Sequence, residues 1–306
     1  MATDILALGE PLVEYNQTGE GDGRHYLQGF GGDTSNAAIA AARQGARVGY
    51  LTAVGDDAHG ALLRALWAGE GVDGSHVRVD SRFPTGVYFV THDAAGHRFS
   101  YLRAGSAASR MRPEELPRQA IESAKVLHLS GISAAISETA CDTCFAAVAI
   151  ARSAGVRVSF DTNLRLQLWP MARARAVMEA LIAQSDLCLP SHDDVRVLFG
   201  LDAPDALVDR CRELGARAVA LKLGRDGALV DDGARRIRIE PHPCNAVDAT
   251  GAGDVFGGSL LARLVAGDDL ESAARYATVA AALSTEGFGA VAPIPRRERV
   301  LSALGR

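Results

Sequence analysis

Short apolar segments with strand character alternate with longer helical segments along most of this chain of 306 residues. The apolar segments are residues 4–8, 47–53, 126–129, 156–160, 186–189 and 218–222, and the helical ones are 34–44, 58–70, 138–154, 171–184, 203–214, 252–266, 269–286 and 295–304. This alternation predicts a doubly wound α/β fold, in which helices cover both faces of a mainly parallel sheet. Sheets of this kind bind ligands at the carboxyl ends of their strands.

Two stretches, residues 11–31 and 83–103, break the alternation because they are turn-rich and favour β-structure. Apolar and polar residues alternate on both sides of Asp93-Ala-Ala-Gly96, which predicts a hairpin. We therefore expect a small inserted β-sheet lid within one domain that spans residues 1–306. Because such an insertion exposes edge strands, which a second lid can cover, we expect a homo-oligomer, a dimer or larger, built through the lids.

Composition and charge exclude several classes of partner. The formal net charge of −5 argues against a nucleic-acid or membrane surface. No apolar run reaches transmembrane length, and the first residues lack a basic stretch before an apolar one, so we expect a cytoplasmic protein. The five scattered cysteines are typical of reduced thiols, including the Cys141/Cys144 pair in a predicted helix. His128, within an apolar run, is interpreted as a hydrogen-bonded core residue.

The heptad Asp248-Ala-Thr-Gly251-Ala252-Gly253-Asp254 leads from a polar, glycine-rich loop into an apolar helical segment. The free N–H groups at a helix start bind anions, and small residues let a phosphate approach them. A carboxylate at Asp254, in the first turn, is suited to accept a proton from a hydroxyl that attacks a phosphoryl group. The alternative is a glycine-rich turn with an ordinary helix-start charge.

A second glycine cluster, with Gly31 and Gly32, precedes the predicted helix at 34–44. Its functional interpretation is close backbone approach to a polyhydroxyl ligand whose hydroxyls bind Asp33 and Asn36. The alternative is a turn in which Asp33 caps the helix. The chain contains no phosphate-binding GxxxxGK[ST] motif, and no GxGxxG follows the first strand, which argues against a nicotinamide-dependent oxidoreductase.

Together, the two glycine-rich segments resemble the two signature regions of the ribokinase/PfkB carbohydrate kinase family. The resemblance covers essentially the whole chain and implies the ribokinase-like body with its β lid. It also implies that the amides of Gly251, Ala252 and Gly253 form an anion hole for the transferred phosphoryl group. Asp254 is then the base that deprotonates the sugar hydroxyl.

Further segments resemble the members of this family that phosphorylate 2-keto-3-deoxygluconate, a sugar acid. They are residues 9–13, 101–107, 127–132 and 161–165, with Leu168-Trp169 after them. The last of these segments adds Asn163 to the candidate sugar-binding residues. The resemblance departs at Leu164, where these kinases prefer tyrosine, and this change could loosen the specificity for acid sugars.

Arginine is the preferred bidentate partner of a carboxylate, so Arg103 on the lid and Arg165 after a body strand are candidates to close on the sugar acid. Tyr88 and Tyr101 would add hydroxyl donors. The alternative is that the arginines are surface or ion-paired residues, for example Arg165 with Asp161. Fructokinase-like relatives also tend to carry both arginines, so these favour an acid sugar without excluding a neutral or phosphorylated one.

The resemblance implies ATP as the phosphoryl donor. Lys222, Gly224 and Gly227 resemble the family's turn near the nucleotide, with Lys222 meeting a phosphate as a point charge. Gly287 lies in a segment that resembles the loop beside adenine. The alternative for the lysine turn is an ordinary β-turn with a solvated lysine.

The family's Asn-x-x-Glu segment near the metal and phosphate appears here as Ser191-His-Asp-Asp194. Mg²⁺ keeps several waters and often uses only one or two carboxylates, so Asp194 remains a candidate to bind it through water. A monovalent cation is also compatible with the resemblance.

We predict an ATP- and Mg²⁺-dependent sugar kinase that phosphorylates the terminal hydroxyl of 2-keto-3-deoxygluconate to give 2-keto-3-deoxy-6-phosphogluconate. The alternatives are a fructokinase or another PfkB-type sugar kinase, and a sugar-binding sensor without catalysis. The intact segment from Gly251 to Asp254 argues against the sensor.

Overall fold

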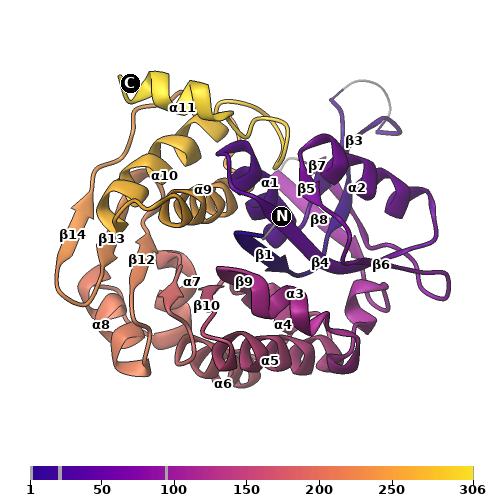
Figure 1. Ribbon diagram of the computed structural model, residues 1–306. Coiled ribbons are helices and arrows are strands. Elements are labelled where there is room, and N and C mark those ends of the chain that lie inside the picture. The colour runs from indigo at the N-terminus through magenta and orange to yellow at the C-terminus, as the bar shows by residue number, and fades with distance from the viewer. Residues whose placement is uncertain (1–2, 20–22, 94–95, 306) are drawn as a thin grey trace.

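The structure is a computed structural model that describes residues 3–19, 23–93 and 96–305 (Figure 1). Its strands are β1(Ile5–Leu8), β2(Leu12–Gln17), β3(Tyr26–Gly31), β4(Val48–Gly55), β5(Val72–Asp73), β6(Val77–Asp80), β7(Val87–Asp93), β8(Gly96–Leu102), β9(Val126–Ser130), β10(Arg157–Asp161), β11(Leu187–Cys188), β12(Val219–Lys222), β13(Ala228–Asp231) and β14(Arg236–Ile239). Its helices are α1(Asp33–Arg43), α2(Ala58–Gly69), α3(Arg118–Ser123), α4(Gly131–Ala135), α5(Glu138–Ser153), α6(Met171–Ile182), α7(His192–Phe199), α8(Pro204–Leu214), α9(Ala252–Ala266), α10(Leu270–Ser284) and α11(Arg297–Ala303).

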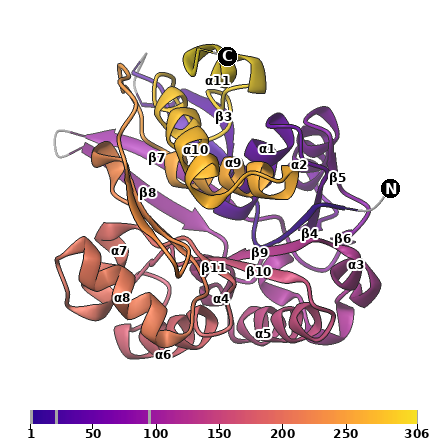
Figure 2. The same cartoon turned by 60° about the vertical axis from the view of Figure 1, so that its left-hand side comes forward.

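The large sheet has the strand order β14-β13-β12-β11-β10-β9-β1-β4-β5, with β6 also paired to β4. Every pairing from β12 to β5 is parallel, as is that of β6. Figures 1 and 2 show α1, α9 and α10 on one face of the sheet and α4, α5 and α6 on the other. Strand β1 shows why helices cover both faces of the sheet. Leu6 and Leu8 pack into the core on one face, and Ile5 and Ala7 pack into the core on the other. The predicted doubly wound α/β fold is confirmed.

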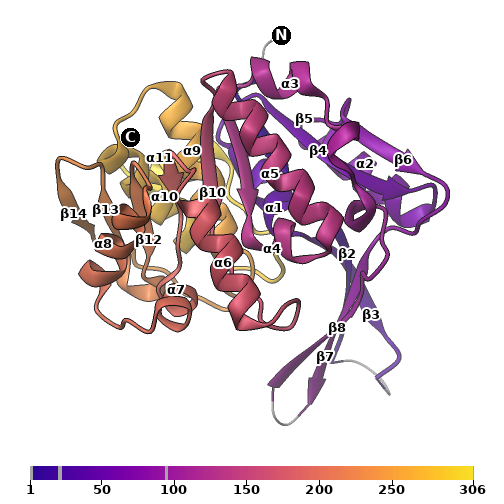
Figure 3. The same ribbon diagram turned by 90° about the horizontal axis from the view of Figure 1, so that it is seen from below.

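A separate four-stranded sheet has the order β3-β2-β7-β8 and projects from the body (Figure 3). Strands β2 and β7 are parallel, and the other two pairings are antiparallel. The predicted small sheet is therefore confirmed, and β7 and β8 form the expected hairpin. Within the predicted lid, residues 20–22 and the hairpin positions 94–95 lie outside the described residues.

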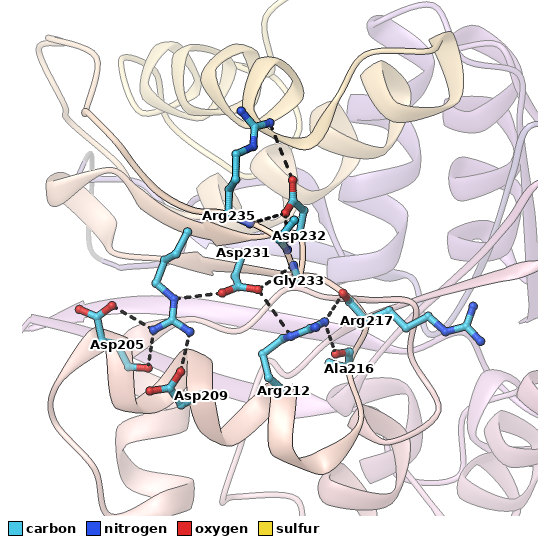
Figure 4. A network of polar contacts seen from close by, with 11 residues as sticks. Asp205, Asp209, Arg212, Ala216, Arg217, Asp231, Asp232, Gly233 and Arg235 are labelled. Atoms are coloured by element: carbon cyan, nitrogen blue, oxygen red, sulfur yellow. Dashed lines mark hydrogen bonds and ion pairs between the residues drawn. The ribbon is translucent and has the colours of Figure 1, made fainter.

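Two antiparallel strands, β13 and β14, extend the sheet beyond β12, and the pattern of strands and helices did not predict them. An ion-pair network on α8 holds this hairpin (Figure 4). The Arg236 guanidinium contacts Asp205 at 3.1 Å and Asp209 at 2.6 Å on α8, and Asp231 on β13 at 3.0 Å. The network fixes the edge strands that follow the strand carrying Lys222.

Most predicted helices appear within two residues of their expected bounds. The short helices α3, α4 and α7 were not predicted.

The cysteines are free thiols, as expected, and four of the five are buried. His128 is buried with Nδ1 3.2 Å from Ser159 Oγ, which confirms its core role. Among the described residues, no helix combines the length and apolarity needed to cross a bilayer.

Helices α1 and α9 approach closely because Gly258 has no side chain. A Cβ at Gly258 would lie 2.1 Å from the carbonyl oxygen of Ala37, whereas a Cβ at the neighbouring Gly257 would lie 3.3 Å from Leu189 Cδ1, the end of a flexible side chain. We expect Gly258→Ala to lower the free energy of unfolding by about 2 kcal/mol or more, because the two helices must separate.

Thermal unfolding of Gly258→Ala beside Gly257→Ala checks this expectation. Both changes add a methyl group to a helix interior and gain similar helix propensity, so Gly257→Ala is the matched control. Equal melting temperatures for the two variants would contradict the packing argument.

Candidate active site

The carboxyl edge of the parallel strands gathers polar side chains at one place. Glu10 follows β1, Asp161 ends β10, and Lys222 ends β12. The start of α9 reaches the same edge, because a Cβ at Gly253 would lie 3.5 Å from Lys222 Nζ. These side chains surround the region where an open α/β sheet binds its ligand.

Helix α9 begins at Ala252, as predicted, behind Gly251 in the left-handed region with φ 76°. The loop before it is held by Asp248, whose carboxylate accepts from the Thr250 amide at 2.9 Å and from the Gly289 amide at 2.8 Å. The first-turn N–H groups of a helix lack partners within the helix, so this start can bind an anion. The Ala252 amide, however, donates to the Ala249 carbonyl at 3.1 Å, so one of the three predicted amides already has a partner.

Asp254, in the first turn of α9, lies against Asn36 on α1. Asn36 Nδ2 donates to Asp254 Oδ2 at 2.8 Å, so two residues from distant parts of the chain are brought together. Loss of water around the carboxyl, with the nearby negative charge of Asp33, raises the pKa of Asp254 to about 8. A carboxyl with such a pKa is suited to exchange protons near neutral pH.

Asp33 is the first residue of α1, and the cap position is occupied by Gly32, so the alternative of Asp33 as the helix cap is wrong. Gly32 has φ 101°, and a Cβ there would lie 2.4 Å from the Glu10 carbonyl oxygen. Asp33 Oδ2 accepts from Asn163 Nδ2 at 2.9 Å. Asn163 has a positive φ of 31°, which is uncommon outside glycine and is found at functional sites.

Lys222 is not a solvated turn residue, since its side chain is 11% exposed. Its Nζ lies 2.5 Å from Asp161 Oδ2. Asp161 Oδ1 is buried and has no hydrogen-bond partner among the described residues. Burial raises the pKa of Asp161, and the positive charge of Lys222 opposes that rise.

The small sheet presents Tyr88 to this region, but in a different role from the one predicted. The Tyr88 hydroxyl donates to the buried carboxylate of Glu14, so its single proton is already used. A sugar hydroxyl at Tyr88 would then meet an acceptor, whereas the sequence predicted a donor. A Cβ at Gly31 would lie 2.6 Å from this hydroxyl, which explains the glycine.

Arg103, just after β8, is paired with the buried carboxylate of Glu10. The other Glu10 oxygen, Oε1, accepts from Ser106 Oγ at 2.8 Å. The Arg103 guanidinium carbon lies 5.4 Å from the ring centre of Tyr101, whose ring stacks on that of Tyr88 at 5.6 Å. Tyr101 is 40% exposed.

Arg165 is half exposed and lies 3.7 Å from Asp194 Oδ1, not beside Asp161. Asp194 Oδ2 also accepts from the Leu164 amide at 3.2 Å, and Ser191 caps α7 by accepting from the Asp194 amide at 3.4 Å. Among the described residues, no cluster of three histidine, cysteine or acidic side chains forms a metal cage. This donor set fits a Mg²⁺ ion held mainly by phosphate and water, with a carboxylate at its edge.

The remaining predicted nucleotide residues are distributed around the ends of β12 and α10. Gly224 begins a short 3-10 helix at Gly224–Asp226, after β12. Gly227 lies against β14, where a Cβ would meet the Ile239 carbonyl at 2.1 Å, so packing alone requires glycine there. Gly287 lies after α10 against Pro293.

Glu10 and Glu14 were not among the predicted site residues, and Asp161 was considered only as a partner of Arg165. Each is a buried carboxylate that holds a predicted site residue: Arg103, Tyr88 or Lys222. An acidic residue in or directly after an apolar strand is the signal that could have found them, because a buried charge needs a partner.

The chain matches the model of the "pfkB family carbohydrate kinase" over residues 2–297. It is 35% identical to the 2-dehydro-3-deoxygluconokinase of Thermoproteus tenax over 311 residues, covering 98% of this chain and 94% of the relative. It is 31% identical to fructokinase-1 of Oryza sativa subsp. japonica, covering 98% and 97%. A double mutant of the Vibrio cholerae O395 fructokinase, solved with fructose, ADP and potassium ion bound, superposes with a TM-score of 0.89 at 26% identity, covering 99% of both chains.

Proposed function

Because the chain belongs to the pfkB family of carbohydrate kinases, we propose that it transfers the γ-phosphoryl group of ATP to the terminal, sixth-carbon hydroxyl of 2-keto-3-deoxygluconate. The product is 2-keto-3-deoxy-6-phosphogluconate. In this proposal the whole chain is one kinase domain, and the four-stranded sheet is the lid over the sugar.

The observation that carries this proposal is the pairing of Asn36 with Asp254 at the anion-binding start of α9. Asp254 takes the proton of the sugar hydroxyl as its oxygen attacks the γ-phosphorus in line, and the bond from phosphorus to the ADP oxygen breaks. The amides of Gly251 and Gly253 and the ammonium of Lys222 stabilise the negative charge that develops. Asn36 holds the carboxylate of Asp254 toward the sugar.

Mg²⁺ that accompanies ATP supplies charge neutralisation at the phosphates. Asp194 would approach it through water, because both of its carboxylate oxygens already lie near donors. Asp161, with one oxygen lacking a partner among the described residues, is a second carboxylate at this edge of the sheet. The potassium ion of the fructokinase structure makes a monovalent cation a further candidate.

Two observations concern which sugar is the substrate. The relative with 35% identity is a kinase of the keto-deoxy acid, and Arg103 and Arg165 are the predicted partners of its carboxylate. Fructose is the second candidate, because both arginines are already paired with carboxylates, Arg103 with Glu10 and Arg165 with Asp194. A neutral sugar has no charge to place beside these pairs.

A coupled ADP-release assay with Mg-ATP against 2-keto-3-deoxygluconate, fructose, ribose and gluconate tests the proposal. We expect the highest kcat/KM for the keto-deoxy acid. Arg165→Ala should raise KM for the acid far more than KM for fructose. Preferred turnover of fructose, with equal effects of Arg165→Ala on both sugars, would replace the acid by fructose as the substrate.

The pH dependence of the reaction follows from Asp254. Only the carboxylate form accepts a proton, and a carboxyl with a raised pKa stays protonated below it, so kcat/KM should rise as pH increases through about 8. Asp33→Asn removes a neighbouring negative charge and should move this rise to lower pH. A rate for the wild-type protein that is flat between pH 6 and 9 would contradict the assignment.

We also propose that the lids pair in a homo-oligomer. Several large apolar side chains of the small sheet are exposed, namely Tyr26, Leu27, Phe99 and Leu102. A partner lid would cover them together with the edge strands β3 and β8. Light scattering at micromolar concentration should give at least a dimer, and a monomeric mass would refute the pairing.

A further inference from the structure

Glu10 is the most deeply buried charged group beside the candidate sugar site. Its side chain is fully inaccessible, and Arg103 holds it from the lid while Ser106 donates to Oε1. Among the described residues, Arg103 Nε is buried without a hydrogen-bond partner, so the pair with Glu10 does not use all the donors of the guanidinium. Arg103 is thus shared between an internal carboxylate and whatever binds beside Tyr101.

The charge of Glu10 acts against an anionic ligand. A substrate carboxylate that approaches Arg103 also approaches Glu10, and at this depth two negative charges repel each other with little screening. A neutral sugar hydroxyl approaching the same guanidinium meets no such penalty. Burial raises the pKa of Glu10, the positive charge of Arg103 opposes that rise and so favours the carboxylate, and the nearby negative charge of Asp33 adds to the rise.

We infer that Glu10 sets the ratio of the affinities for a sugar acid and for a neutral sugar, by competing with the substrate carboxylate for Arg103. Glu10 contacts Arg103 rather than the reacting atoms, so it is a positioning and specificity-determining residue. This inference rests on the proposed function for one point, that Arg103 lies at the sugar.

The pair cannot be explained by stability alone. A buried ion pair contributes little net stability compared with apolar residues of similar volume. A repulsive group is, however, an effective means of discriminating between two ligands that differ in charge. The position of the pair, linking the end of β1 to the end of lid strand β8, places that discrimination at the boundary between body and lid.

The test is Glu10→Gln, which removes the charge and keeps the shape. We would measure by calorimetry, without nucleotide, the Kd for 2-keto-3-deoxygluconate and for fructose. We expect the ratio of the two affinities to move toward the acid by about tenfold. Ser106→Ala, which removes the hydrogen bond to Oε1 and leaves the charge in place, is the matched control and should leave the ratio unchanged.

A double-mutant cycle with Arg103→Gln separates competition from a general loosening of the site. In the Arg103→Gln background, the shift caused by Glu10→Gln should become much smaller, because Arg103 no longer draws the substrate carboxylate toward Glu10. An unchanged ratio in Glu10→Gln, a shift toward fructose, or the same shift with and without Arg103 would overturn the inference.

A wrong proposed function would give a different experimental result from a wrong inference about Glu10. If the proposed function is wrong, the wild-type protein will turn over fructose and not the keto-deoxy acid. The gain in acid affinity on Glu10→Gln would then still support the inference about Glu10. If the wild-type protein phosphorylates the acid but Glu10→Gln leaves the affinity ratio unchanged, only the inference falls.

Discussion

Asp254→Asn should lower kcat by roughly 10²- to 10⁴-fold and leave the Kd for the sugar nearly unchanged. In the wild-type protein Asn36 Nδ2 lies 2.8 Å from Asp254 Oδ2. An asparagine at position 254 has the same shape, and its side-chain oxygen can still accept this hydrogen bond. What is lost is the ability to take the proton of the attacking hydroxyl. Steady-state kinetics combined with calorimetry of sugar binding measures both quantities.

The loss should also appear in the pH profile, because the remaining activity of Asp254→Asn should not rise through pH 8 as that of the wild-type protein does. Asn36→Ala is the informative companion. Asn36→Ala keeps the carboxylate of Asp254 and removes the hydrogen bond that this carboxylate accepts. The kcat of Asn36→Ala should therefore lie between those of the wild-type protein and Asp254→Asn. An Asp254→Asn variant within threefold of the wild-type rate would remove Asp254 from the role of base.

Lys222→Met should lower kcat/KM for ATP by about 10²- to 10³-fold, since one positive charge beside the anion-binding helix start is lost. The same change leaves the buried carboxylate of Asp161 without its partner at 2.5 Å, which destabilises the fold. The two effects can be separated with the Lys222→Met/Asp161→Asn double variant. It should recover much of the lost melting temperature and none of the lost activity.

Kinetics with varied Mg-ATP and thermal unfolding of the three proteins decide between a catalytic and a structural role for Lys222. If the double variant regains both stability and near wild-type kcat/KM for ATP, the lysine acts only as the partner of Asp161.

The six parallel strands from β12 to β4 could be predicted because their segments are mainly apolar, whereas the short parallel strands β5 and β6, which include charged residues, were not predicted. Mainly apolar segments, for example Ile5–Leu8, can only be buried between two helical layers. Strands β13 and β14 escaped prediction for a physical reason. In β14, Arg236–Ile239, charged and apolar residues alternate in only four positions. Its place in the sheet depends on Asp205, Asp209 and Asp231, which meet Arg236 only in the folded chain.

The candidate site also combines features that could be predicted from the sequence with features that could not. The two glycine clusters predicted close backbone approach, and in the second cluster the structure shows it within the protein, with Gly31 against Tyr88 and Gly32 against the Glu10 carbonyl. The partners of the charged residues could not be predicted, because spacing along the chain does not say which carboxylate meets which donor. Arg165 lies beside Asp194 rather than Asp161, and the Tyr88 hydroxyl donates a hydrogen bond to Glu14.

The proposed reaction transfers a phosphoryl group to the terminal hydroxyl of the keto-deoxy acid. The most direct test is ³¹P NMR of the reaction of the wild-type protein with Mg-ATP and 2-keto-3-deoxygluconate. We expect a new phosphate monoester whose phosphorus couples to the two protons of the sixth carbon, formed in step with ADP. An ester at another carbon, or no ester while fructose is phosphorylated, would contradict it.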